Sequence, residues 1–150
     1  MIALDTNILV YAEAAADPSE RHVTAQHLML KLGETGAIIP LQVLAEFLNV
    51  CRTKAVLSTE QAVFRATQYA AVFDCPQTRI GDLLAAARIA HARKLAFFDS
   101  LIVAIAARAG ATLLLSEDMQ DGLEIEGLRI INPFSVSNAA LIDDYLGSAV

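Results

Sequence analysis

The sequence has no tryptophan and few aromatic residues, three tyrosines and six phenylalanines. Extensive base stacking, on which single-strand nucleic-acid binders depend, is therefore not expected. Two cysteines, Cys51 and Cys75, are too few for a disulfide framework, and no CxxC or Cys/His cluster indicates zinc. Both lie in apolar contexts, so we expect reduced cysteines in the core.

Long apolar runs are also missing, and none reaches the roughly 18 residues that span a bilayer. The longest candidate, Leu101 to Leu115, is too short and contains Arg108. No basic stretch precedes an apolar one at the N-terminus, and Asp5 falls where a signal peptide would be apolar. The sequence thus predicts a soluble, cytoplasmic protein without membrane contact.

Basic residues are outnumbered, because 11 lysines and arginines stand against 17 aspartates and glutamates, for a net charge of −6. Such a balance argues against a protein that holds nucleic acid by bulk electrostatics. It leaves room for a local basic patch, and for an acidic site whose charge changes when a cation binds.

Apolar residues make up 55% of the 150 residues, which suits one domain with a sizeable core. Short apolar runs alternate with longer helical patterns, and a last helix is possible from Ser135. This alternation predicts an α/β fold, a mostly parallel central sheet flanked by helices. The expected strands are 1–4, 37–39, 112–116 and 128–131, and the expected helices are about 8–12 (or a turn there), 19–32, 41–54, 58–73, 80–94 and 99–110.

Acidic side chains follow two of the expected strands. Asp5 comes directly after the first, and Ser116-Glu117-Asp118 follow the strand that begins at Thr112. Sites in parallel sheets form outside the carboxyl ends of the strands, so these residues are candidates for chemistry. Taken alone, Asp5 could equally be a helix cap and 116–122 an ordinary polar loop.

Two further acids lie on expected helices. Asp99 is placed to open the helix that closes at Gly110, where aspartate is a common cap. Glu46 lies on a mixed face of helix 41–54, whose apolar side holds Leu44, Phe47, Leu48 and Cys51. Either acid alone could be an ordinary cap or surface residue.

Together these carboxylates predict a cation site, because gathered carboxylates repel one another unless a cation or protons intervene. Oxygen ligands without a His or Cys cluster favour Mg²⁺ or Mn²⁺. Such an ion makes bound water a better nucleophile and stabilises charge on a phosphodiester. The pattern therefore indicates a nuclease.

Four segments resemble the motifs of PIN-domain proteins, in particular VapC-type toxins of toxin–antitoxin pairs. They are Ala3-Leu4-Asp5-Thr6-Asn7, Gln42-Val43-Leu44-Ala45-Glu46-Phe47, Phe98-Asp99-Ser100-Leu101 and Leu114-Leu115-Ser116-Glu117-Asp118-Met119. The resemblance covers roughly residues 1–134, and we expect the tail 135–150 to belong to the same domain. It implies a PIN-like three-layer fold, Mg²⁺- or Mn²⁺-dependent cleavage of RNA, homodimerisation and a VapB-like antitoxin partner.

The resemblance also assigns roles to residues. It implies catalytic Asp5, Glu46, Asp99 and Asp118, with Asp5, Asp99 and Asp118 as metal ligands. Glu117 and Asp121 compete with Asp118 for the fourth position, and Asp118 is favoured because it lies two residues beyond the hydroxyl at the strand end. The supporting residues would be Thr6, Asn7, Ser116 and Asp121.

Two basic groups could contact RNA phosphates around this site, or could simply be solvated helix faces. Apolar residues of helices 19–32 and 59–73 could form a dimer face or an antitoxin groove. The basic groups are Arg79, Arg88, Arg93 and Lys94, and Arg52 with Lys54.

An inactive PIN-like module that only binds partners is the main alternative. A phosphoaspartate receiver would need an acidic pair near the first strand and a Lys after a late strand. An Asp-x-Asp phosphatase would need Asp at the position of Asn7.

Overall fold

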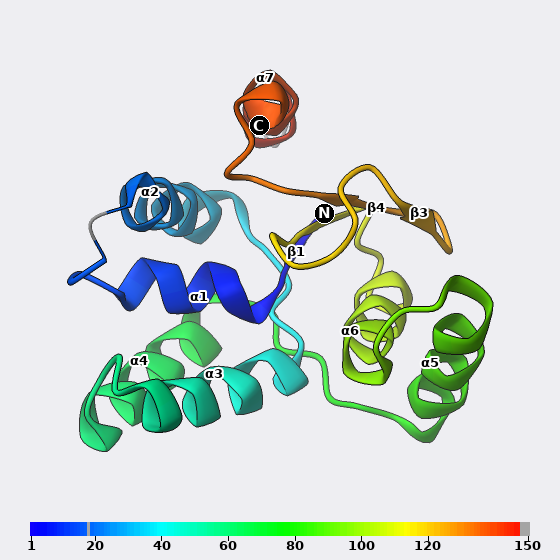
Figure 1. Ribbon diagram of the computed structural model, residues 1–150, viewed down its shortest axis with the longest axis horizontal. Helices are drawn as coiled ribbons and strands as arrows, with labels where there is room; N and C mark the ends of the chain where they lie inside the picture. Colours follow the sequence, from blue (N-terminus) through cyan, green and yellow to red (C-terminus); the bar gives the residue numbers. More distant parts are fainter. Residues whose placement is uncertain (18, 148–150) are drawn as a thin grey trace.

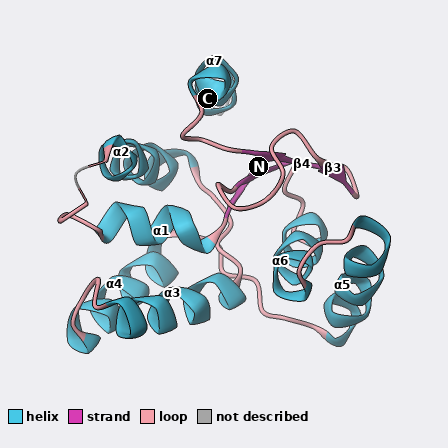
Figure 2. Cartoon of the chain, viewed as in Figure 1, coloured by secondary structure: helices cyan, strands magenta, loops and turns pink. Residues whose placement is uncertain are grey.

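The computed structural model describes residues 1–17 and 19–147, and its sheet is mostly parallel. Within this part of the chain the strand order is β1-β2-β4-β3. The strands, magenta in Figure 2, lie among the helices. β1, β2 and β4 run parallel, and only the edge strand β3 is antiparallel. The strands are β1 (Ile2–Leu4), β2 (Leu113–Leu115), β3 (Glu124–Ile125) and β4 (Leu128–Ile131).

Helices pack around this sheet, as the sequence predicted. Figure 1 shows α1 to α4 gathered to one side of β1 and α5 with α6 on the other. A short 3₁₀ turn, Val136–Asn138, leads into α7, which contacts α2. The helices are α1 (Thr6–Glu13), α2 (Glu20–Thr35), α3 (Leu41–Lys54), α4 (Thr59–Val72), α5 (Ile80–Arg93), α6 (Phe97–Arg108) and α7 (Ala139–Gly147).

The sheet is the centre of the core. Every residue of β1 and β2 is buried, as expected for parallel strands covered on both faces. Ile102 and Ile105 of α6 are fully buried as well. Ile142 and Leu146 of α7 are also buried, so the C-terminal tail contributes to the same hydrophobic core. No helix in the described ranges is long and apolar enough to cross a bilayer.

Capping residues explain several helix ends. Ser58 and Gln61 form a reciprocal capping box at the start of α4. α2 continues to Thr35 and ends at Gly36, whose φ of 88° lies in the region that favours glycine. Ser19 immediately precedes α2, but its side chain makes no capping hydrogen bond.

Two strand predictions need correction. Residues 37–39 form only single bridges at Ile38, to Ala3 and to Asp74. Pro40 lacks an N–H, which stops the pairing with β1 from extending beyond Ile38. β3, which was not predicted, is a two-residue strand that pairs with β4 across the turn Glu126-Gly127. Both turn residues have positive φ, 53° and 77°, as the tightest hairpins require.

Some side chains differ from expectation. Leu48, predicted on the apolar side of α3, is exposed, whereas Leu44 and Phe47 are buried. Both cysteines are free; Cys51 is buried, as predicted, but Cys75 is only partly buried. Burial raises the pKa of both thiols, which disfavours the reactive thiolate.

An ion pair joins α5 to α6. Arg108 Nε lies 2.7 Å from Asp82 Oδ1, and Arg108 Nη2 lies 2.9 Å from Asp82 Oδ2. Asp82 is buried and also accepts the Arg79 backbone N–H at 2.8 Å. The Arg108 guanidinium holds the pKa of Asp82 below its usual value.

Replacing Arg108 by Met is expected to lower the free energy of unfolding by roughly 2–3 kcal/mol at pH 7, because Asp82 would remain buried and unpaired. A carboxyl with a lowered folded-state pKa stabilises the protein above its unfolded pKa and loses that contribution as the pH falls. The deficit should therefore shrink towards pH 3, as measured by urea unfolding. The matched control is Arg88→Met, on an exposed arginine of α5. An equal loss in both variants would contradict the assignment.

Candidate active site

Asp5 lies where β1 ends and α1 begins, and it is only 4% exposed. Its Oδ1 accepts the Thr6 backbone N–H at 2.7 Å, so it does cap α1. Its Oδ2 accepts the Ser116 hydroxyl at 2.6 Å and the Asn7 amide at 3.1 Å. Burial nevertheless raises the pKa of Asp5 to about 6, and the charges of Asp99 and Asp118 add to the shift. Asp5 is thus a fixed carboxylate in acidic surroundings.

Glu46 on α3 is oriented by two side chains. Its Oε2 accepts the Thr6 hydroxyl at 3.1 Å, and its Oε1 accepts the Gln42 amide at 2.8 Å. Thr6 begins α1, directly after Asp5, so its hydroxyl links the first acid to the second. Gln42 lies one helical turn before Glu46, a spacing at which side chains on one helix face meet.

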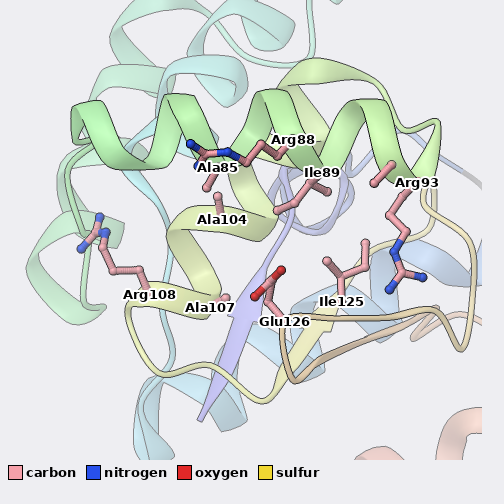
Figure 3. A pocket seen from close by; sticks show the side chains of 10 residues that line it. Ala85, Arg88, Ile89, Arg93, Ala104, Ala107, Arg108, Ile125 and Glu126 are labelled. Carbon is pink, nitrogen blue, oxygen red and sulfur yellow. The ribbon is translucent and has the colours of Figure 1, made fainter.

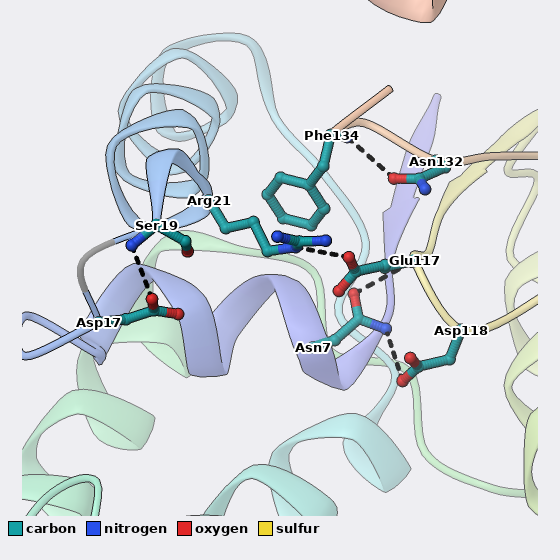
Figure 4. A network of polar contacts seen from close by, with 8 residues as sticks. All are labelled: Asn7, Asp17, Ser19, Arg21, Glu117, Asp118, Asn132 and Phe134. Atoms are coloured by element: carbon teal, nitrogen blue, oxygen red, sulfur yellow. Dashed lines mark hydrogen bonds and ion pairs between the residues drawn. The ribbon is translucent and has the colours of Figure 1, made fainter. Parts of the chain in front are cut away.

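Asp118 is connected to Asp5 through one amide group. Asn7 Nδ2 donates to Asp5 Oδ2 and, at 3.2 Å, to Asp118 Oδ2. Asn7 Oδ1 accepts the Glu117 backbone N–H at 3.3 Å (Figure 4). Ser116 Oγ, which donates to Asp5, also accepts the Met119 backbone N–H at 3.2 Å. Asn7 and Ser116 therefore attach the loop after β2 to the end of β1.

Asp99 completes the group of acids from α6. It is not the cap that the sequence suggested, because α6 begins two residues earlier and Asp99 lies in its first turn. A negative charge is favourable there. Burial, then the charges of Glu46 and Asp118, raise the pKa of Asp99. The Asp99 carboxyl therefore interacts electrostatically with two of the other acids.

The four predicted acids line one hollow of about 440 Å³ at the carboxyl ends of β1 and β2. Thr6 and Asn7 line it too, together with Tyr11 and Lys54. The structure thus brings together side chains that are up to 113 positions apart in the chain, from Asp5 to Asp118. The negative charges of these acids repel one another, and a bound cation would reduce that repulsion.

The model of the PIN domain family matches residues 2–120, most of the chain. The chain belongs to the PIN-domain family. No curated protein matches it significantly.

Three solved structures share the fold of this PIN domain. VapC20 of Mycobacterium tuberculosis, described as a sarcin-ricin loop cleaving toxin, has a TM-score of 0.65 at 18% identity, over 79% of this chain and 92% of VapC20. VapBC2 of Rickettsia felis, bound to promoter DNA, has a TM-score of 0.65 at 19% identity, over 88% of this chain and 98% of the matched chain. A toxin–antitoxin complex of Klebsiella pneumoniae has a TM-score of 0.64 at 18% identity, over 91% of this chain and 100% of the matched chain. At such identities the likeness confirms the PIN fold alone.

The oxygen donors of this PIN domain suit Mg²⁺ or Mn²⁺, both of which prefer carboxylates. In the described residues no three acidic, His or Cys side chains already converge closely enough to hold an ion. Mg²⁺ commonly takes one or two carboxylates and completes its shell with waters and substrate phosphates. The hollow has room for such a water-rich site, so the residues fit an ion that is not fully enclosed by protein.

Two sets of predicted residues lie away from the acids of the PIN domain. Asp121, predicted to support the site, instead accepts the Asn132 backbone N–H and the Asn138 amide. Arg88 and Arg93 line a different hollow, of about 560 Å³, between α5, α6 and the β3–β4 turn (Figure 3). Of the second basic group, Lys54 lines the acidic hollow, whereas Arg52 bonds Asn49 at 3.2 Å.

Sequence reasoning missed several residues that shape the site. Gln42 could have been found, because it precedes Glu46 by one helical turn. No local sequence signal marks Tyr11 or Arg21. Tyr11 lines the hollow, and Arg21 reaches from α2 to Glu117 in the loop that carries Asp118. Their placement depends on how α1 and α2 pack.

Proposed function

We propose that this PIN domain is a Mg²⁺- or Mn²⁺-dependent endoribonuclease that acts in the cytoplasm as the toxin of a VapC-type toxin–antitoxin pair. One observation carries the proposal: Asp5, Glu46, Asp99 and Asp118 line a single hollow at the carboxyl ends of parallel strands. The VapC fold of the solved neighbours supports the same function.

In this proposal Asp5, Asp99 and Asp118 hold the cation, which would stabilise charge on the phosphate and activate water. Asn7 and Ser116 fix the Asp5 carboxylate, and Asn7 also orients Asp118. Thr6 and Gln42 hold both oxygens of Glu46, so its carboxylate can position an attacking water. These hydrogen bonds set the acids in place before substrate binds, which lowers the reorganisation needed during reaction.

An apolar groove offers a place for the antitoxin. Residues of α1, α2 and α4 line a hollow of about 590 Å³, including Met29, Leu30, Val72 and Phe73. Leu30 and Val72 are exposed there. We propose that an amphipathic segment of a VapB-like antitoxin lies in this groove.

Two exposed apolar patches, one on α5 and one on α6, suit the homodimer. Ile80 and Leu84 of α5 and Phe97 and Phe98 of α6 are all exposed. Ile80 and Leu84 lie one helical turn apart, and Phe97 and Phe98 contact edge to face at 5.5 Å; exposed apolar patches can mark interaction surfaces. We propose that a second copy of the chain covers them.

Metal-dependent cleavage of RNA tests the proposed activity. Purified protein, free of antitoxin, would be incubated with a pool of structured RNAs in Mg²⁺, in Mn²⁺ and in EDTA. Defined fragments in either metal and intact RNA in EDTA are expected. Intact RNA under every condition, from protein that binds the pool, would instead support an inactive PIN module that acts through partners.

Lys54 is expected to bind the RNA backbone, because it brings a cationic side chain to the acidic hollow. Lys54→Met should weaken RNA binding by roughly fivefold and lower the slope of log K against log salt by about one. Arg52→Met is the matched control, since it removes the same charge two residues away but outside the hollow. Equal effects in filter binding over a salt series would contradict a specific role for Lys54.

A further inference from the structure

An arginine on α2 is tied to the loop that carries Asp118. Arg21 Nε lies 2.5 Å from Glu117 Oε1, although the two residues are 96 positions apart (Figure 4). Glu117 stands between Ser116, which bonds Asp5, and Asp118, which bonds Asn7. A contact that fixes Glu117 therefore acts on Asp118, which lines the acidic hollow, and on Ser116, which holds Asp5.

Aromatic rings hold Arg21 in place for this contact. Its guanidinium carbon lies 5.8 Å from the centre of the Tyr11 ring and 6.0 Å from that of Phe134. The two rings meet edge to face at 5.2 Å. Such contacts attract the guanidinium and restrict the Arg21 side chain. The ion pair with Glu117 therefore costs less side-chain entropy.

Glu117 has a second partner. Burial, and then the neighbouring carboxylate of Glu117, raises the pKa of Tyr11 to about 12. Its backbone N–H donates to Asn7 Oδ1. The side chain of Glu117 is thus occupied by Arg21 and Tyr11, and it is absent from the lining of the acidic hollow. This arrangement separates Glu117 from the neighbouring Asp118, which does line the hollow.

We propose that Arg21 is a positioning residue that, through Glu117, holds the 116–119 loop so that Asp118 faces Asp5 and Asp99. Arg21 does not line the hollow, so in this proposal it acts on the site through Glu117. The kinetic part of this inference rests on the proposed nuclease function; the structural part does not.

Amide hydrogen exchange in metal-free protein tests the structural part directly. Arg21→Met should lower the protection of the Glu117 amide by about tenfold, because its bond to Asn7 depends on the loop position. Glu117→Gln should have the same effect, and the double variant should be no worse than either single one. Additive losses, or unchanged protection at Glu117 in Arg21→Met, would overturn the proposal.

Arg65→Met is the matched control. Arg65 also pairs through Nε with a glutamate, Glu13, at 2.7 Å, and it lies 5.6 Å from the centre of the Tyr69 ring. It lines the α2–α4 groove and not the acidic hollow. Exchange at Glu117 should be unchanged in this variant. A similar loss of protection there would show general loosening, and would also overturn the proposal.

Kinetics of RNA cleavage test the positioning role. Arg21→Met should reduce kcat about tenfold or more while leaving KM for RNA within about twofold, and Arg21→Lys should recover part of the loss. A rise in KM alone would make Arg21 an RNA contact. Full inactivation by Glu117→Gln with an unaffected Arg21→Met would make Glu117 a metal ligand. Either result would contradict the proposal. If wild-type protein cleaves no RNA, the proposed function fails, and the exchange experiment still decides the inference.

Discussion

Asp99→Asn is expected to reduce RNA cleavage by roughly 10³-fold or more, because a carboxylate that helps a cation stabilise the transition state contributes several kcal/mol. The substitution keeps the size of the side chain and removes its charge. No donor in the described residues bonds the Asp99 carboxylate, so little folding energy should be lost. Single-turnover cleavage in saturating Mn²⁺ would measure the effect.

Asp74→Asn is the control for this substitution. Asp74 is exposed, and it lines a hollow with Met1 and Ile2, at the start of β1 and away from the acids. It makes the same chemical change without touching the proposed site, so cleavage should stay at the wild-type rate. Wild-type activity in Asp99→Asn, or equal losses of activity in both variants, would show that Asp99 is not part of the site.

Asp5→Asn is expected to stabilise the metal-free protein while abolishing its activity. Asp5 is almost fully buried, and its pKa is raised from 3.8 to about 6, so its charged form opposes folding at neutral pH. A shift of this size corresponds to at most about 3 kcal/mol. An amide nitrogen in place of Oδ2 cannot accept the Ser116 hydroxyl or the Asn7 amide, and the loss of these two bonds offsets part of this gain. The net effect should raise the melting temperature in EDTA at pH 7.5 by about 2–6 °C.

Mn²⁺ should reverse this order. A ligand that binds only the folded state stabilises it, so Mn²⁺ should raise the melting temperature of wild-type protein but not that of Asp5→Asn. Asp74→Asn should respond to Mn²⁺ as wild type does. A lower melting temperature of Asp5→Asn in EDTA would instead show that Asp5 serves mainly as the cap of α1.

Much of the fold could be predicted because its signals are local. Apolar runs mark β1 and β2, the capping box of Ser58 and Gln61 starts α4, and an apolar tail forms α7. The element that was missed, β3, has only two residues, too few for a period to show. The residues around Ile38 form single bridges and no strand, because Pro40 follows them.

The convergence of the four acids on one hollow was also predictable in part, since Asp5 and Asp118 follow strands that pair directly. Their supporting contacts were less so. Thr6 to Glu46 and Asn7 to Asp118 join residues 40 and 111 positions apart, and only packing decides such pairs. The same holds for Arg21 and Glu117, and for Arg88 and Arg93, which line a hollow other than the one that holds the acids.

The central claim is that the four acids of this PIN domain form a site for a divalent cation. Calorimetric titration of metal-free protein with Mn²⁺, beside Asp99→Asn and Asp74→Asn, tests it most directly. The account predicts saturable binding by wild type and Asp74→Asn, weakened at least about tenfold in Asp99→Asn. No binding by wild type, or equal affinity in all three proteins, would contradict it.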